Sequence, residues 1–71
     1  MAQTVDKTAT TQLGTLLQEH HEAVMLGREL IRIALCARVA NRIEEAIAAE
    51  EVAEEYIAKS VELEARLRVA L

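Results

Sequence analysis

The chain has 71 residues, of which 52% are hydrophobic and 28% are charged, and its formal net charge is −4. This length allows one domain, the aliphatic content is too high for a typical disordered chain, and the negative charge disfavours nonspecific binding to nucleic acid or anionic membranes. Cys36 is the single cysteine, which excludes an intramolecular disulfide. Because a chain this small buries a modest core, we expect oligomerisation to supply the missing stability.

Residues 1–11 are polar and rich in threonine, which is a poor helix former. They lack the apolar stretch of a signal peptide, and we interpret them as a flexible N-terminal arm before a single helical-hairpin domain over residues 12–71. The lone thiol is typical of a reducing compartment, and the most apolar window, residues 23–40, is interrupted by four charged residues. We therefore expect a cytoplasmic protein that does not span a membrane.

Helical periodicity begins near Leu13, with Thr11 or Thr15 as the candidate N-cap, and no glycine or proline occurs from residue 28 to residue 71. Steps of three and four residues place one apolar stripe on the first half of the chain and another on the second half. The first stripe comprises Leu13, Leu16, Leu17, His20, Val24, Gly27, Ile31, Ala34, Leu35 and Arg38. The second comprises Ala46, Ile47, Ala49, Val52, Ala53, Tyr56, Ile57, Leu63, Leu67 and Ala70.

The sequence predicts the break between the two halves at Asn41, which is a good N-cap and stands three residues before Glu44, the spacing of a capping box. The pattern predicts an all-α protein, an antiparallel hairpin of two helices at about residues 12–40 and 42–70. Residues 12–42 carry a charge of +1 and residues 43–71 a charge of −5, so the two arms attract each other. The alternatives are one continuous helix, or a break near Gly27 or near Lys59.

Each predicted helix has an apolar stripe wider than a single helix–helix contact requires. Small residues, among them Ala34, Ala46 and Ala53, favour a close approach of the two arms, whereas the large aliphatic residues need another cover. We therefore expect two or more hairpins to associate into a four-helix bundle or a larger helical oligomer. The predicted oligomer core comprises Leu17, Val24, Leu30, Ile31, Leu35, Ile47, Val52, Ile57, Leu63 and Leu67.

Residues that could carry chemistry are few. Adjacent His20 and His21 point about 100° apart on a helix, so both cannot ligate one metal ion, and we expect a partly buried His20 and an exposed His21. The four arginines between residues 28 and 42 either pair with glutamates of the second arm or grip phosphates. The candidate contacts to a partner or an anion are Met25, Arg28, Arg32, Arg38, Arg42 and Tyr56.

These features favour a non-enzymatic protein of phage or bacterial type, which regulates or inhibits another protein as a homodimer or higher oligomer. The alternative is a binder of RNA or a small nucleotide through arginines repeated across the oligomer. We expect no catalytic residue, no metal and no cofactor. The predicted outline is similar to that of small dimeric helical hairpins such as the plasmid-encoded RNA-binding copy-number regulators. That resemblance is one of architecture alone, so no residue role is carried over.

Overall fold

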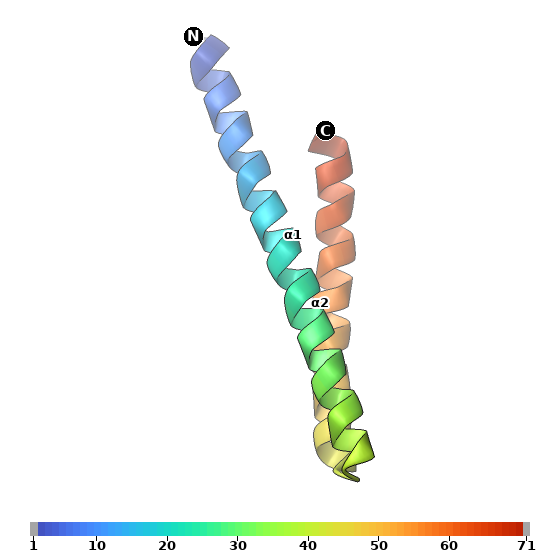
Figure 1. Ribbon diagram of the computed structural model, residues 1–71. Helices are drawn as coiled ribbons and strands as arrows, with labels where there is room; N and C mark the ends of the chain where they lie inside the picture. Colours follow the sequence, from blue (N-terminus) through green and yellow to red (C-terminus); the bar gives the residue numbers. More distant parts are fainter. Residues whose placement is uncertain (1, 71) are drawn as a thin grey trace.

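The computed structural model describes residues 2–70, with side chains from residue 11 onward. It contains two α-helices, α1 (Ala2–Val39) and α2 (Ile43–Ala70), which pack against each other and run in opposite directions (Figure 1). The molecule is a narrow rod with extents of 60 × 14 × 13 Å. The predicted all-α hairpin is confirmed, and with it the position of the break between the helices.

The turn differs from the expected capping box. Asn41 has a φ angle of 62°, which places it in the left-handed region, and its N–H donates to the carbonyl of Arg38 at 3.0 Å. The N–H of Arg42 donates to the carbonyl of Ala37 at 2.7 Å. These two bonds form a Schellman motif, in which Asn is the second choice after Gly at the left-handed position. Asn41 thus ends α1 and is not the N-cap of α2.

Arg42 is the N-cap residue of α2, because its carbonyl accepts the first hydrogen bond of the helix from the N–H of Ala46 at 3.0 Å. Glu44 and Glu45 lie in the first turn of α2, where carboxylates complement the helix dipole. The two glutamates therefore stabilise the start of α2, although Asn41 is not its N-cap.

The helices meet along a seam made mainly of small residues. Its residues recur every three or four positions in both helices, which is the spacing of a coiled coil. The seam comprises Leu13, Leu16, His20, Ala23, Gly27, Leu30, Ala34 and Ala37 of α1, and Ala46, Ala49, Ala53, Tyr56, Ser60, Leu63 and Leu67 of α2. Six of its alanines are buried, with exposed fractions of 0 to 8%. The hydroxyl of Ser60 donates to the carbonyl of Ile57 at 2.7 Å, so this polar seam residue is satisfied within its own helix.

The seam runs along one edge of the first predicted stripe and through the middle of the second. Ala23 and Ala37 are buried although neither belongs to the predicted stripe, whereas Leu17 and Leu35 belong to it and are exposed. The reason is geometric: two helices share one narrow contact line, and small side chains allow the backbones to come closest there. The expected closeness through small residues is confirmed, but the large aliphatic residues flank the seam.

Helix α1 begins at Ala2, about ten residues before the expected start near residue 12. Thr15 lies inside the helix, where its hydroxyl donates to the carbonyl of Thr11 at 3.0 Å, so neither threonine is an N-cap. Once a helix is nucleated, a threonine costs only a few tenths of a kcal/mol, roughly, to include in it. The flexibility of residues 1–11 and their separation from a domain over residues 12–71 stay predictions.

Candidate interaction surface

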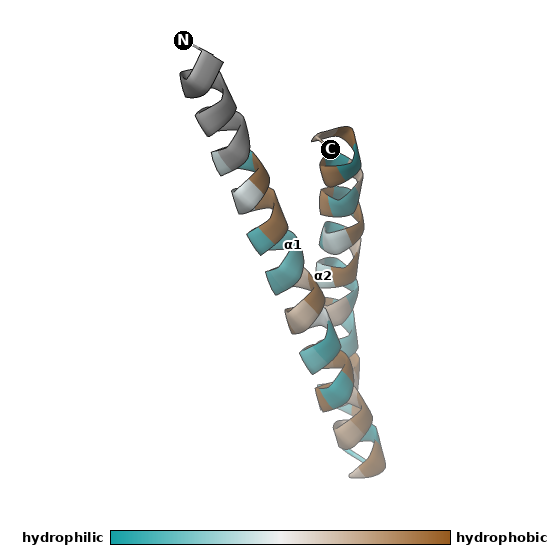
Figure 2. Ribbon diagram, turned by 45° about the horizontal axis from the view of Figure 1, so that its top comes forward, coloured by the Kyte–Doolittle hydropathy of each residue, from teal (hydrophilic) through white to brown (hydrophobic). Residues whose placement is uncertain are grey.

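Large aliphatic side chains cover one side of the hairpin. This side is formed by the residue that follows each seam residue, together with Ile43 at the start of α2. We call this side the aliphatic face; its aliphatic residues are Leu17, Val24, Ile31, Leu35, Ile43, Ile47, Ile57 and Val61. All of these except the half-buried Val24 are exposed, with fractions of 41 to 60%. The hydropathy colouring of Figure 2 shows such hydrophobic stretches alternating with hydrophilic ones along both helices.

An ion pair between the helices establishes that these residues share one side. Arg38 and Glu50 each follow a seam residue, and they form a bidentate pair in which Nε donates at 2.6 Å and Nη2 at 2.8 Å. The hydrogen bond from Arg38 lowers the pKa of the Glu50 carboxyl and raises the pKa of the guanidinium. The pair therefore bridges α1 and α2 within the aliphatic face.

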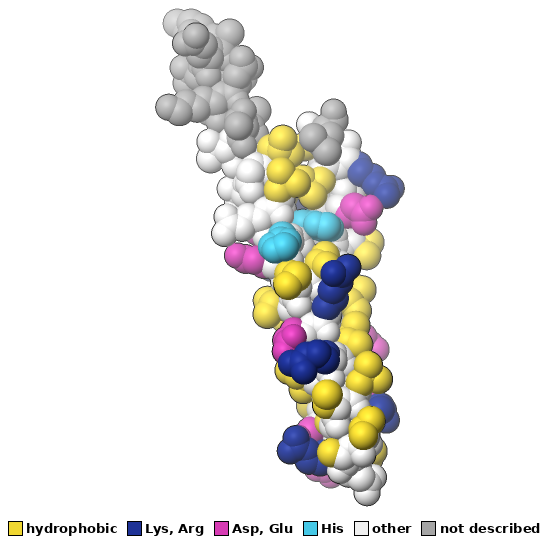
Figure 3. Space-filling model, in the orientation of Figure 1, with side chains coloured by type: hydrophobic (Ala, Val, Ile, Leu, Met, Phe, Trp, Pro, Cys, Tyr) yellow, Lys and Arg dark blue, Asp and Glu magenta, His cyan; other side chains and the backbone are white. Residues whose placement is uncertain are grey.

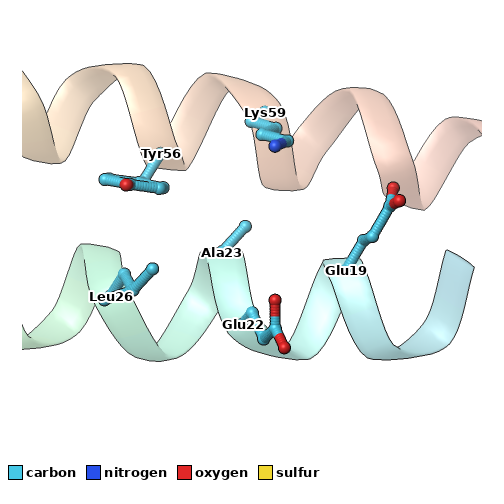
Figure 4. Close-up of a pocket in the computed structure, with 6 residues that line it drawn as sticks. All are labelled: Glu19, Glu22, Ala23, Leu26, Tyr56 and Lys59. Atoms are coloured by element: carbon cyan, nitrogen blue, oxygen red, sulfur yellow. The ribbon is translucent and has the colours of Figure 1, made fainter. Parts of the chain in front are cut away.

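The opposite side of the hairpin carries a shallow groove between the helices. It is lined by Glu19, Glu22, Ala23 and Leu26 of α1 and by Tyr56 and Lys59 of α2, and its volume is about 190 Å³. Figure 4 shows the small side chain of Ala23 pointing towards α2, between Tyr56 and Lys59. This side has fewer large aliphatic residues, namely Leu26, Ile33 and Val52, which are 40 to 45% exposed.

Three of the four candidate arginines are engaged in ion pairs with glutamates. Arg32 pairs with Glu29 of its own helix, Arg38 pairs with Glu50, and Arg42 pairs with Glu45 at 3.3 Å. Within the part of the chain whose side chains are described, Arg28 forms no ion pair. The arginines thus face different glutamates and do not converge on one anion site.

The other candidate contacts are divided between two sides. Met25, Arg28 and Arg32 follow each other at helical spacing on the outer surface of α1, and all three are exposed. Tyr56 is half-buried in the groove on the other side of the seam, so it does not join them. Figure 3 shows the basic side chains spaced apart along the molecule, several of them beside acidic ones, with the two histidines side by side near the middle of this view.

The histidines lie as expected, with His20 half-buried in the seam and His21 exposed. Among the described residues, no group of three or more His, Cys, Asp or Glu side chains is arranged to hold a metal ion. Neither of the two helices, over the described residues, is long and apolar enough to cross a membrane.

Comparison of the chain with protein-family models, with curated proteins and with solved structures finds no match. The surface itself is therefore the basis for inferring a function.

One feature of this surface escaped the sequence reasoning. In each helix, the residues that directly follow the seam residues form a second row. This row has the same heptad spacing as the seam and lies one position further along the sequence. The sequence holds the signal, because Leu17, Val24 and Ile31 are seven residues apart. In the sequence this row merges with the seam residues into one broad stripe, because periodicity alone does not show which residues of the stripe face the other helix.

Proposed function

We propose that this chain is a non-enzymatic interaction protein that self-associates as a homodimer or higher oligomer and regulates or inhibits another protein by binding it. The observation that carries the proposal is the aliphatic face, whose large side chains stay partly exposed to water in a single hairpin. Clusters of exposed large aliphatic side chains bordered by charged ones are typical of interaction sites.

The surface area of the chain supports the same proposal. The accessible surface is 5661 Å². A compact monomer of 7.9 kDa exposes about 4,400 Å², so the hairpin exposes about 1,200 Å² more than such a monomer. The excess follows from the rod shape, which leaves more side-chain surface exposed than a compact monomer does, and a stable interface of standard size would cover about 800 Å² per partner.

Sedimentation equilibrium tests self-association directly. We expect the wild-type chain to have at least twice the mass of 7.9 kDa at micromolar concentration. Replacing Ile57 with Asp should lower both the mass and the helix content, because a buried carboxylate at the oligomer core is costly. The matched control is Ala58→Asp, one residue further on, which is exposed and lies off the aliphatic face. A wild-type chain that stays monomeric and melts cooperatively would refute the proposal.

The surface left uncovered by self-association is the candidate for a second protein. The groove at Tyr56 and the neighbouring Leu26 offer an apolar contact bordered by charges, which suits a protein partner. Affinity capture with the wild-type chain, repeated with Leu26→Ala, which changes an exposed residue of the groove outside the seam, tests this part of the proposal. We expect a partner that is retained by the wild type and lost by the variant, while the mass of the oligomer stays unchanged.

Anion binding by repeated arginines is the alternative. The ion pairs of Arg32, Arg38 and Arg42 with glutamates weaken its support, since each guanidinium already has an acceptor. A titration with salt distinguishes the two, because binding to RNA phosphates weakens steeply with ionic strength whereas apolar docking does not.

A further inference from the structure

The aliphatic face has a charge pattern that fits a second copy of itself. On α1, the residues that follow the seam include Arg28 and Arg38 and no acid, which gives +2. On α2, the corresponding residues include Glu50, Glu54, Glu64 and Arg68, which gives −3 + 1 = −2. One edge of the face is thus basic and the other acidic to the same extent.

Most of these charges are satisfied within the chain. Arg38 pairs with Glu50, and Arg68 pairs with Glu64 at 2.8 Å. Over the described side chains, this leaves one cation and one anion of the face without an ion pair, Arg28 on α1 and Glu54 on α2. Two opposite charges, one on each helix, therefore remain available to a partner.

Arg28 and Glu54 lie at the same level along the hairpin. Each directly follows a seam residue, Gly27 and Ala53, and these two are neighbours across the seam, because a Cβ added at Gly27 would lie 4.0 Å from the carbonyl oxygen of Ala53. A rotation of 180° about an axis parallel to the rod keeps this level. This rotation places the α1 side of the aliphatic face of one copy against the α2 side of the aliphatic face of the other copy.

We propose, on the basis of the self-association inferred above, that two copies pack through their aliphatic faces about a two-fold axis parallel to the hairpin, with both turns at the same end. In this dimer Arg28 faces Glu54 of the partner subunit, twice by symmetry. Leu35 lies at the level of Ile47 of the partner subunit in the same way, since both follow seam residues near the turn. Every helix then has two antiparallel neighbours, which is the arrangement of a four-helix bundle.

The other face-to-face dimer has its turns at opposite ends. It lays α1 on α1 and α2 on α2, so the basic edge meets a basic edge and the acidic edge an acidic one. Facing like charges are unfavourable at an interface. The charge pattern therefore selects the dimer with both turns at one end.

A charge swap tests the contact. Arg28→Glu and Glu54→Arg should each weaken dimerisation by about tenfold or more, because each places like charges opposite each other, and the double variant should restore most of the loss. The matched control is Glu55→Arg, which makes the same charge change one residue away and off the face. Sedimentation at several concentrations gives the dissociation constants. Failure of the double variant to recover would refute the contact.

The position of the turns tests the arrangement independently of stability. Ala40, which is exposed in the turn, can be replaced with Cys in a Cys36→Ser chain and spin-labelled. We expect the two labels of a dimer to be close together. Turns at opposite ends would separate them by about 40 Å, the length of α2 at 1.5 Å per residue.

The outcomes separate the two proposals. A monomeric wild type would overturn self-association, and this dimer with it. A dimer whose labels lie about 40 Å apart, the α2 length at the helical rise, would overturn the arrangement and leave self-association intact.

Discussion

At the scale of single residues, Asn41 determines where the chain reverses. It is the one non-glycine residue with a positive φ angle in the described part of the chain, and the hydrogen bonds around it satisfy the last carbonyls of α1. Asn tolerates this conformation better than residues with larger or branched side chains. The identity of residue 41 therefore affects stability although its side chain is exposed.

Replacing Asn41 tests this role. Asn41→Val should lower the free energy of unfolding by about 1 kcal/mol or more, because a β-branched residue is strained at positive φ. Asn41→Gly should leave it unchanged or raise it, since Gly has no Cβ to clash. Urea denaturation at one fixed protein concentration measures both variants. Equal stability of the Val and Gly variants would contradict the observed turn.

The ion pair between Arg38 and Glu50 gives a dependence on pH. The pKa of Glu50 is lowered from 4.5 in the folded state, mainly by the hydrogen bond from Arg38, so its contribution to stability is present above the pKa of the unfolded carboxyl. That contribution is lost as the pH falls through the lowered folded value. The pair is exposed, so the effect should be small.

The variant Glu50→Gln tests this dependence. Its stability should fall less steeply than that of the wild type when the pH is lowered below 4.5, because the variant has no carboxyl to protonate. Glu51→Gln, which changes an exposed neighbour off the aliphatic face, should follow the wild-type curve. Thermal melts across this pH range measure the difference, and parallel curves for all three chains would count against the ion pair.

At the scale of elements, the contact between α1 and α2 depends on small residues, and Gly27 lies at its centre. A Cβ added there would meet the Cγ1 atom of Ile57 at 3.5 Å and the Cβ atom of Tyr56 at 3.7 Å, which are ordinary contact distances. The seam therefore has room for a methyl group at this position. A longer side chain would have to push the helices apart.

Gly27→Ala should consequently stabilise the chain by up to about 1 kcal/mol, because Ala has the higher helix propensity and fills the space. Gly14→Ala is the matched control, since a Cβ at Gly14 meets nothing within 4 Å. The stability change of this variant therefore reports helix propensity alone. Gly27→Leu should destabilise the hairpin. A loss of stability in Gly27→Ala would show that the helices approach more closely than described.

The sequence predicts these elements well where periodicity and charge act together. The two helices, their antiparallel pairing and the break at Asn41 follow from the spacing of apolar residues and from the opposite charges of the arms. The seam could not be located in the same way. Alanine is only weakly apolar, so Ala23 and Ala37 do not stand out, although their small size is what brings the helices together. The start of α1 was placed too late because propensity alone underestimates helix propagation.

The sequence indicates which large apolar residues are available for an interaction surface, but not on which side of each helix they lie. Five residues of the predicted oligomer core are exposed members of the aliphatic face, namely Leu17, Ile31, Leu35, Ile47 and Ile57. By contrast, Leu63 and Leu67 are buried within the hairpin itself, at 2% and 7% exposure. Side-chain position around a helix depends on which residues form the seam, and a stripe read from sequence does not fix that. Their role in an oligomer stays a prediction.

At the scale of the whole molecule, stability and association should be linked. A hairpin whose buried side chains are mostly alanines gains little from its own seam, and covering the aliphatic face adds the larger aliphatic contribution. Folding then depends on protein concentration, because association draws the equilibrium towards the folded state.

We therefore expect the melting temperature to rise with protein concentration. For a dimer that unfolds as it dissociates, each tenfold increase adds about 1.4 kcal/mol to the stability of the assembly. Circular dichroism melts between micromolar and submillimolar concentration measure this shift. A melting temperature independent of concentration would mean that the hairpin is stable by itself.

The position of Tyr56 has an optical consequence. It is the single aromatic residue of the chain and is half-buried in the groove between the helices, on the side opposite the aliphatic face. Its ultraviolet emission is therefore not masked by tryptophan and reports on the separation of α1 from α2. The dimer proposed above does not cover the phenol, so the emission changes only when α1 and α2 separate. The intrinsic fluorescence of the unlabelled protein can thus distinguish opening of the hairpin from separation of its copies.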